Sequence, residues 1–182
     1  MARIGVLALQ GAFAAHGRML ERLGHEPVWV RTASDLAGID GLVLPGGEST
    51  THLKLLTSQN LKTPLREWIA TGKPILATCA GAILAAKEVT PEQESFAWID
   101  ITVQRNAWGR QIASFEAVAD TGHPLVFIRA PRIERVGENV DVLASLQGEP
   151  IMVKQGNCIA ATFHPELTDD DWVHRTVFGV VK

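Results

Sequence analysis

The chain has 182 residues, a length typical of one domain with a substantial core. Charged residues make up 20% of it and hydrophobic residues 46%, which excludes a disordered chain. The net charge of -3 argues against a nucleic-acid partner, and no apolar run reaches the roughly 20 residues of a membrane-spanning helix.

The cysteines and the first residues indicate where the protein works. Residues 1–9 predict a first strand and are too short for a signal peptide. Two cysteines, of which one is needed as a free thiol, are typical of a reducing cytoplasm. No spacing of potential ligands is typical of a metal site, so we expect neither a metal nor a cofactor.

Strand and helix patterns alternate in the first half of the chain. Continuous apolar runs predict buried parallel strands, and helical spacing places Phe13, Met19, Leu20 and Leu23 on one face of a helix. Strands are expected at 3–9, 26–30, 41–44 and 74–78. Helices are expected at 12–23, in a short turn capped by Ser34, at 65–71 after Thr63 and Pro64, and at 82–86.

The second half has the short strands and polar breaks of antiparallel hairpins. Strands are expected at 99–103, 112–116, 126–128, 140–144, 150–154 and 158–163, and a last helix at 168–178. The sequence therefore predicts a single α/β domain over 1–182. Its mixed, mostly parallel central sheet has helices on both faces and an antiparallel extension.

Cys79 follows an apolar strand and precedes a helical stretch, within the run Ala-Thr-Cys-Ala-Gly at 77–81. A strand that turns sharply into a helix around one small residue is typical of a nucleophile elbow. The start of a helix also favours the thiolate, which is the reactive form. Without this context, a cysteine in an apolar run is usually a buried hydrophobic residue, and we interpret Cys158, in mid-strand, in that way.

His164 and Glu166 follow the strand expected at 158–163. A lone histidine here is more often a surface or capping residue. However, α/β enzymes gather their chemistry at the carboxyl ends of strands. Cys79, His164 and Glu166 could then serve as a nucleophile, a base and the group that orients the base.

Residues 45–49, Pro-Gly-Gly-Glu-Ser, follow another strand. Two glycines allow a close backbone approach to a ligand, so the N–H of Gly47 could join that of Ala80 as an oxyanion-hole donor. The alternative is a tight turn with Ser49 as a helix cap. A phosphate-binding P-loop is excluded because the Gly-Lys-Ser/Thr ending is missing.

Three further loops carry polar residues and glycines near the expected site. Gln10 and Gly11 end the first strand, on the same sheet edge. Arg105 and Arg129 lie in the loops 105–111 and 127–131, and their guanidinium groups suit a substrate carboxylate. Taken alone, such arginines are most often solvated surface residues.

Six runs resemble, in order, those of the glutaminase subunits of pyridoxal 5′-phosphate synthases, which are class I glutamine amidotransferases. They lie at 9–11, 45–50, 78–81, 105–111, 127–131 and 163–168. The resemblance implies a flavodoxin-like fold of that class and a Cys79–His164–Glu166 triad. It also implies glutamine contacts from Gly47, Glu48, Ser49, Arg105, Ile128 and Arg129.

The resemblance implies hydrolysis of L-glutamine, with the ammonia passed to a separate (β/α)₈ synthase subunit in a large hetero-oligomer. Ala77 departs from the family, which has glycine there, and we expect a local adjustment of the elbow. Two alternatives remain open, a stand-alone cysteine hydrolase or peptidase and a non-catalytic scaffold. The Gly46–Gly47 peptide can rotate and so could act as a switch. In this hypothesis, docking of the synthase is sensed near Gln10, Gly11 and Glu48 and selects the productive orientation of the peptide.

Overall fold

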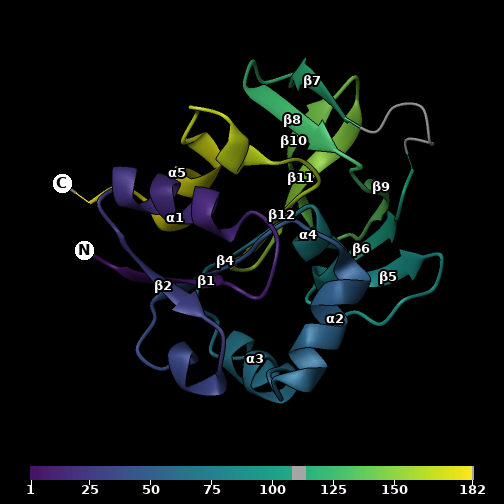
Figure 1. Ribbon diagram of the computed structural model, residues 1–182. Helices are drawn as coiled ribbons and strands as arrows, with labels where there is room; N and C mark the ends of the chain where they lie inside the picture. Colours follow the sequence, from purple (N-terminus) through teal and green to yellow (C-terminus); the bar gives the residue numbers. More distant parts are fainter. Residues whose placement is uncertain (108–113, 182) are drawn as a thin grey trace.

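A seven-stranded sheet forms the centre of the computed structural model, which describes residues 1–107 and 114–181 (Figure 1). Its strand order is β10-β11-β12-β4-β3-β1-β2. The strands from β12 to β2 run parallel, and β11 and β10 continue the sheet in antiparallel fashion. The bounds are β1 Arg3–Leu7, β2 Glu26–Val30, β3 Gly41–Leu44, β4 Ile75–Thr78, β10 Asp141–Leu146, β11 Glu149–Gln155 and β12 Cys158–Ala161.

Helices cover both faces of this sheet, because successive strand residues point to opposite faces and both sets are apolar. Val43 and Leu76 belong to the core beneath α1 and α5. Leu42 and Ala77 belong to the opposite core, beneath α2, α3 and α4. The helices are α1 Phe13–Arg22, α2 Ser49–Ser58, α3 Lys62–Ile69, α4 Ala80–Ala85 and α5 Trp172–Phe178, with 3-10 helices η1 Ala33–Leu36 and η2 Pro165–Leu167.

Two smaller sheets lie beside the β10–β11 side of the central sheet (Figure 1). One has the order β5-β6-β9, and β7 pairs with β8 in an antiparallel hairpin. The bounds are β5 Ala86–Thr90, β6 Ile99–Gln104, β7 Ser114–Val118, β8 Pro124–Ile128 and β9 Arg132–Val136. The ends of β6 and β8 deliver the loops that carry Arg105 and Arg129.

The predicted α/β class, the mixed sheet and the helices on both faces are confirmed. Strands 26–30 and 41–44 have the predicted bounds. Strands β5 and β9 were missed. β5 follows α4 with no intervening turn residue, and in β9 only Ile133 is buried among three charged residues, which resembles a loop.

Several helix boundaries were predicted wrongly. Thr32, not Ser34, precedes η1, and its N–H donates to the Asp35 carboxylate at 2.8 Å. α3 begins three residues before 65, at Lys62, and α5 begins only at Trp172 because η2 forms first. Residues 112 and 113 of the strand expected at 112–116 lie outside the described residues.

Candidate active site

Cys79 lies in the turn between β4 and α4, with backbone angles φ 48° and ψ −104°. A non-glycine residue at positive φ is strained, and the surrounding bonds must hold it in place. The Cys79 N–H donates to the Ala161 carbonyl at 2.8 Å. α4 also packs closely on β3, since a Cβ on Gly81 would lie 2.2 Å from the Leu44 carbonyl oxygen. The strand–turn–helix geometry of the predicted elbow is therefore present.

His164 follows β12, the strand that pairs with β4, and so lies beside the elbow. Its Nδ1 is 2.7 Å from Oε1 of Glu166, and both residues are buried. Gly46 covers the ring, since a Cβ there would lie only 2.4 Å from His164 Cε1. The Nδ1–Glu166 hydrogen bond leaves Nε2 of His164 as the nitrogen that serves Cys79.

The protonation of this pair follows from its surroundings. Burial lowers the pKa of His164, but hydrogen bonds to Cys79 and Glu166 outweigh it and raise the pKa to about 10. Burial opposes ionisation of Glu166, but His16 and His164 hold the pKa of its carboxyl below the usual value. At neutral pH the site therefore favours an imidazolium on a carboxylate, which is the state after proton transfer from the thiol.

A pocket of about 340 Å³ opens over Cys79. It is lined by residues from six separate segments, so the fold gathers what the sequence scatters. Ala80 and Gly46 lie next to lining residues, and Gly11 contacts Gly46. The lining residues are Gln10, Gly47, Glu48, Ser49, Cys79, Ile83, Arg105, Asn106, Ile128, Arg129 and His164.

Glu48, not Ser49, caps α2. Its carboxylate accepts the N–H groups of Thr50 and Thr51 at 3.1 and 2.8 Å. Burial opposes ionisation, but these bonds and those of the two hydroxyls outweigh it and lower the pKa of Glu48 to about 2. The Ser49 hydroxyl instead donates to Oε1 of Gln93 at 2.9 Å, a partner that the sequence analysis missed.

The arginines of the pocket lie in the loops after β6 and β8. Arg105 Nη2 is 3.6 Å from Oε1 of Glu48, which places a positive and a negative group at the same end of the pocket. Arg129 has φ 44°, and the preceding Ile128 carbonyl accepts from Sγ of Cys79 at 3.9 Å. Residues 108–111 of the predicted Arg-Asn-x-x-Gly-Arg-Gln run lie outside the described residues.

Gln10 and Gly11, in the segment that follows β1, contact the loop at 45–49. Gly11, at φ 83°, faces the Gly46 carbonyl so closely that a Cβ would lie 1.8 Å from its oxygen. The Gln10 amide brackets Glu48, donating to its carbonyl at 3.0 Å and accepting its N–H at 3.4 Å. The segment between Gly46 and Glu48 is thus held from the β1 side.

Sequence analysis missed two buried histidines behind Glu166. His16 lies on α1 and His174 on α5, and neither ring is exposed. The available signal was the position of His16, three residues after Phe13 and three before Met19, on the apolar face of its helix. A titratable group on such a face needs a polar partner.

Other chemistries find no support in the described part of the chain. In residues 1–107 and 114–181, no three His, Cys, Asp or Glu side chains gather as a metal-binding group. No helix within those ranges has the length and hydropathy to cross a membrane. Cys158 is buried in β12, and burial raises the pKa of its thiol to about 12, which makes it inert.

A cysteine on a nucleophile elbow, a buried His–Glu pair and a polar pocket are together typical of the α/β enzymes that use a Cys-His-Glu triad. Residues 6–180 match the SNO glutamine amidotransferase family, and the chain belongs to this family.

The relatives agree with this assignment. The "Pyridoxal 5'-phosphate synthase subunit PdxT" of Solibacter usitatus is 54% identical, with 96% of each chain covered. That of Kosmotoga olearia is 50% identical, over 95% of this chain and 94% of the relative. A solved structure described as a glutamine amidotransferase is 45% identical, covers 96% of both chains and superposes with a TM-score of 0.89.

Proposed function

We propose that this chain hydrolyses L-glutamine to L-glutamate and ammonia, and supplies the ammonia to a synthase subunit that makes pyridoxal 5′-phosphate. The observation that carries the proposal is the meeting of Cys79 with the His164–Glu166 pair at the floor of one pocket. The family match and the PdxT relatives support the choice of glutamine over other amides.

The reaction begins with the Cys79 thiol proton already carried by His164, the protonation that the raised pKa of His164 favours. The thiolate attacks the side-chain carbonyl carbon of glutamine, and the N–H groups of Gly47 and Ala80 stabilise the developing oxyanion. Collapse of this intermediate breaks the C–N bond as His164 returns its proton to the leaving nitrogen. Ammonia leaves, and a γ-glutamyl thioester remains on Cys79.

Water then hydrolyses the thioester. Acylation removes the thiolate, and with it two of the causes that raise the pKa of His164. The imidazole can then accept a proton from water, which attacks the thioester and releases glutamate and the thiol. Glu166 keeps the tautomer fixed and stabilises the imidazolium in both halves of the reaction.

The pocket suits the two charged ends of an amino acid. Arg105 and Arg129 are assigned to the α-carboxylate, since a guanidinium binds a carboxylate through two hydrogen bonds. Glu48, whose low pKa keeps it ionised, offers a carboxylate for the α-ammonium group. Ser49 and Ile128 complete the lining that holds the side-chain amide over Cys79.

The surroundings of the subunit form part of the proposal. We assign residues 1–182 to one glutamine amidotransferase domain, which the family match over 6–180 supports. The partner is a synthase subunit, and we propose that it is a (β/α)₈ protein in a large hetero-oligomer. We place the complex in the cytoplasm.

Partner docking is proposed to control the oxyanion hole. The Gly46–Gly47 peptide can rotate at low steric cost, and its carbonyl lies against Gly11 while Gln10 brackets Glu48. Losing one oxyanion donor costs on the order of 10²–10³ in rate, enough to silence the subunit without moving the triad. Docking near Gln10, Gly11 and Glu48 would select the active orientation.

The experiment compares glutamate release by the subunit alone and in a mixture with the synthase, with a peptide substrate as the alternative amide. We expect glutamine hydrolysis to be much faster in the mixture and peptide cleavage to be absent. Cleavage of the peptide with no response to the synthase would instead favour a stand-alone cysteine hydrolase. Equal glutamine turnover with and without the synthase would refute the control but not the chemistry.

A further inference from the structure

His16 faces the oxygen of Glu166 that His164 leaves free. Its Nε2 lies 3.3 Å from Glu166 Oε2, whereas His164 binds Oε1. The same nitrogen lies 3.2 Å from the hydroxyl of Thr78, the residue immediately before Cys79. One ring therefore contacts both the carboxylate and the elbow.

The opposite side of the His16 ring is also fixed. Nδ1 of His16 lies 2.8 Å from Nε2 of His174, on α5. Burial, which outweighs the attraction of Glu166, lowers the pKa of His16, and burial also lowers that of His174. When both rings are neutral, the tautomer that fits the contacts of both ring nitrogens has His16 donating from Nε2 and accepting at Nδ1 from His174.

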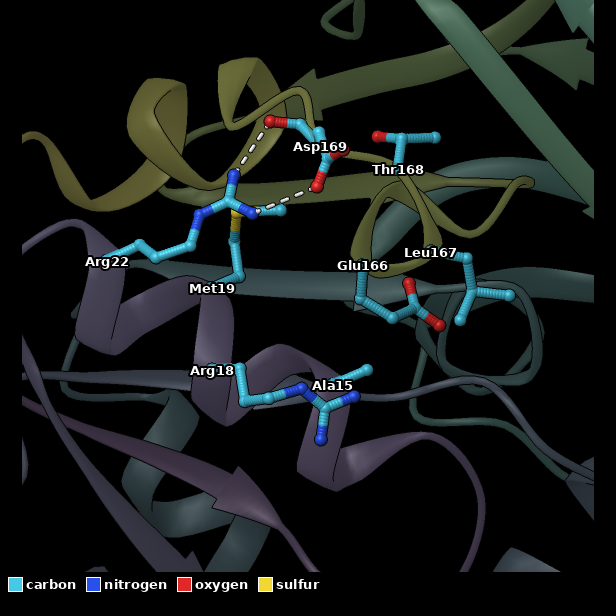
Figure 2. A pocket seen from close by; sticks show the side chains of 8 residues that line it. All are labelled: Ala15, Arg18, Met19, Arg22, Glu166, Leu167, Thr168 and Asp169. Atoms are coloured by element: carbon cyan, nitrogen blue, oxygen red, sulfur yellow. Dashed lines mark hydrogen bonds and ion pairs between the residues drawn. The ribbon is translucent and has the colours of Figure 1, made fainter.

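Figure 2 shows α1 beside η2 and the loop that follows η2, with dashed lines from Arg22 to Asp169. Arg22, one turn and a half beyond His16, donates to the Asp169 carbonyl at 2.7 Å and pairs with its carboxylate at 3.4 Å. The hollow between the two elements, of about 340 Å³, is also lined by Arg18. These contacts join α1 to the loop that follows η2, on the same side of the molecule as the contact of His16 with Glu166.

We propose that His16 is a positioning residue for glutamine hydrolysis, which fixes Glu166 by its second oxygen and couples it through Thr78 to the nucleophile elbow. The proposal rests on the proposed function, because His16 acts only through the His164–Glu166 pair.

Glu166 Oε2 is buried and has no regular hydrogen bond among the described residues, so the contact with His16 Nε2 at 3.3 Å is what stabilises its charge. Removing His16 would leave this carboxylate oxygen without that polar neighbour. Such an oxygen is costly, and the carboxyl responds by rotating away or by holding a proton. Either response weakens its hold on His164. The chemical step would then slow, while glutamine binding in the pocket over Cys79 would not change.

The test compares three variants at His16 with one control variant at His25, and each is assayed in complex with the synthase. In H16A we expect kcat to fall about 10–100-fold, the loss typical when a residue that orients a metal ligand is removed, with KM changed less than about twofold. H16Q should recover most of kcat, because its amide reaches the place of Nε2. H16N, similarly polar but shorter, should stay slow.

The pH profile is a second readout. Loss of the donor disfavours the ionised form of Glu166, so the acidic limb of kcat/KM should move to higher pH in H16A and return in H16Q. The titratable and charged groups around this position are Cys79, His164, Glu166, Asp169, His174, Arg18 and Arg22. None of them is altered by the substitutions.

His25 provides the matched control for stability. It is a buried histidine whose Nε2 lies 3.1 Å from the Gly179 carbonyl, and it does not line the pocket over Cys79. H25A should lower the melting temperature, as H16A should, and leave kcat and the pH profile unchanged. Should H16A fail to fold, the comparison of H16Q with H16N decides.

Two results would overturn the proposal. Equal kcat values in H16Q and H16N, or a kcat of H16A equal to that of the unaltered chain, would show that the Nε2 donor does not matter. C79A, measured in parallel, separates this from failure of the proposed function. If C79A still releases glutamate, the triad itself is wrong and the role of His16 falls with it.

Discussion

The two thiols of the chain belong to neighbouring parallel strands, Cys158 within β12 and Cys79 in the turn after β4. They differ in backbone strain and in hydrogen-bond partners. Cys158 opens β12 opposite Ile75, at the amino end of β4, whereas Cys79 follows the carboxyl end of β4. Burial raises the pKa of Cys158 to about 12. Cys79 has a strained backbone and a hydrogen bond to an imidazole whose pKa is raised to about 10.

The comparison teaches that the two thiols, similar in exposed fraction, are separated by their position along the strand and by the polar partners available there. Both residues are buried, with 4% exposure for Cys79 and 7% for Cys158. The carboxyl ends of β1, β3, β4 and β12 lie at one edge of the sheet, and the segments that follow them carry Gln10, Gly47, Cys79 and His164 of the pocket. The chemistry collects at this edge because there the chain leaves the sheet and backbone and side chains become free to meet a ligand.

The largest effect is expected from the two cysteines themselves. Replacing Cys79 by alanine removes the proposed nucleophile, so glutamate release should fall on the order of 10⁴-fold or more. C158A should retain most of the activity. Initial rates of the two variants in complex with the synthase make the measurement, and a C158A variant as inactive as C79A would break the comparison.

The second effect concerns the group that orients His164. E166Q keeps the size of the side chain but cannot stabilise the imidazolium, so kcat should fall by about 10²–10⁴. KM should change little, because Glu166 does not line the pocket that holds the substrate. A large rise in KM at constant kcat would assign Glu166 to binding instead.

The third effect is confined to binding. R129A should raise KM about 10–100-fold with kcat nearly unchanged, since a hydrogen bond to a charged group contributes about 1.5–3 kcal/mol in both ground and transition states. R105A should follow in the same direction. Arg135, which pairs with Asp100 outside the pocket, gives the control, and R135A should leave KM as it is. A fall in kcat alone would place the pocket arginines in the chemical step.

The smallest effect is on stability. The pKa of His164 in the folded chain, about 10, lies above its value of 6.5 in the unfolded chain. Its contribution to the free energy of unfolding is therefore complete below pH 6.5 and is lost as the pH rises through about 10. Urea denaturation between these pH values should show the decline in the unaltered chain and a weaker one in H164A. An identical slope in both would contradict the raised pKa.

The sequence was sufficient for the central sheet because its strands are continuous apolar runs. Residues 26–30 and 41–44 form strands with the predicted bounds, and Cys79 lies in the predicted turn. β9 was missed because in its sequence, Arg-Ile-Glu-Arg-Val, only Ile133 is buried and three residues are charged, a composition typical of a loop. In such a strand tertiary pairing decides the structure, and local pattern does not.

The candidate site divides in the same way. The residues that line the pocket over Cys79 could largely be predicted, because glycines and polar residues follow the ends of the predicted strands. The two histidines behind Glu166 could not be predicted, because His16 and His174 contact each other across 158 residues of sequence. A histidine on an apolar helix face signals that a partner exists, but only the fold tells which one.

The most direct test of the account labels the complex with an electrophilic analogue of glutamine and locates the adduct by mass spectrometry. The account predicts modification of Cys79 alone, with excess glutamine protecting it. Cys158 provides the internal control in the same spectrum. An adduct on Cys158 with Cys79 unmodified would contradict the central claim that the carboxyl end of β4 carries the nucleophile.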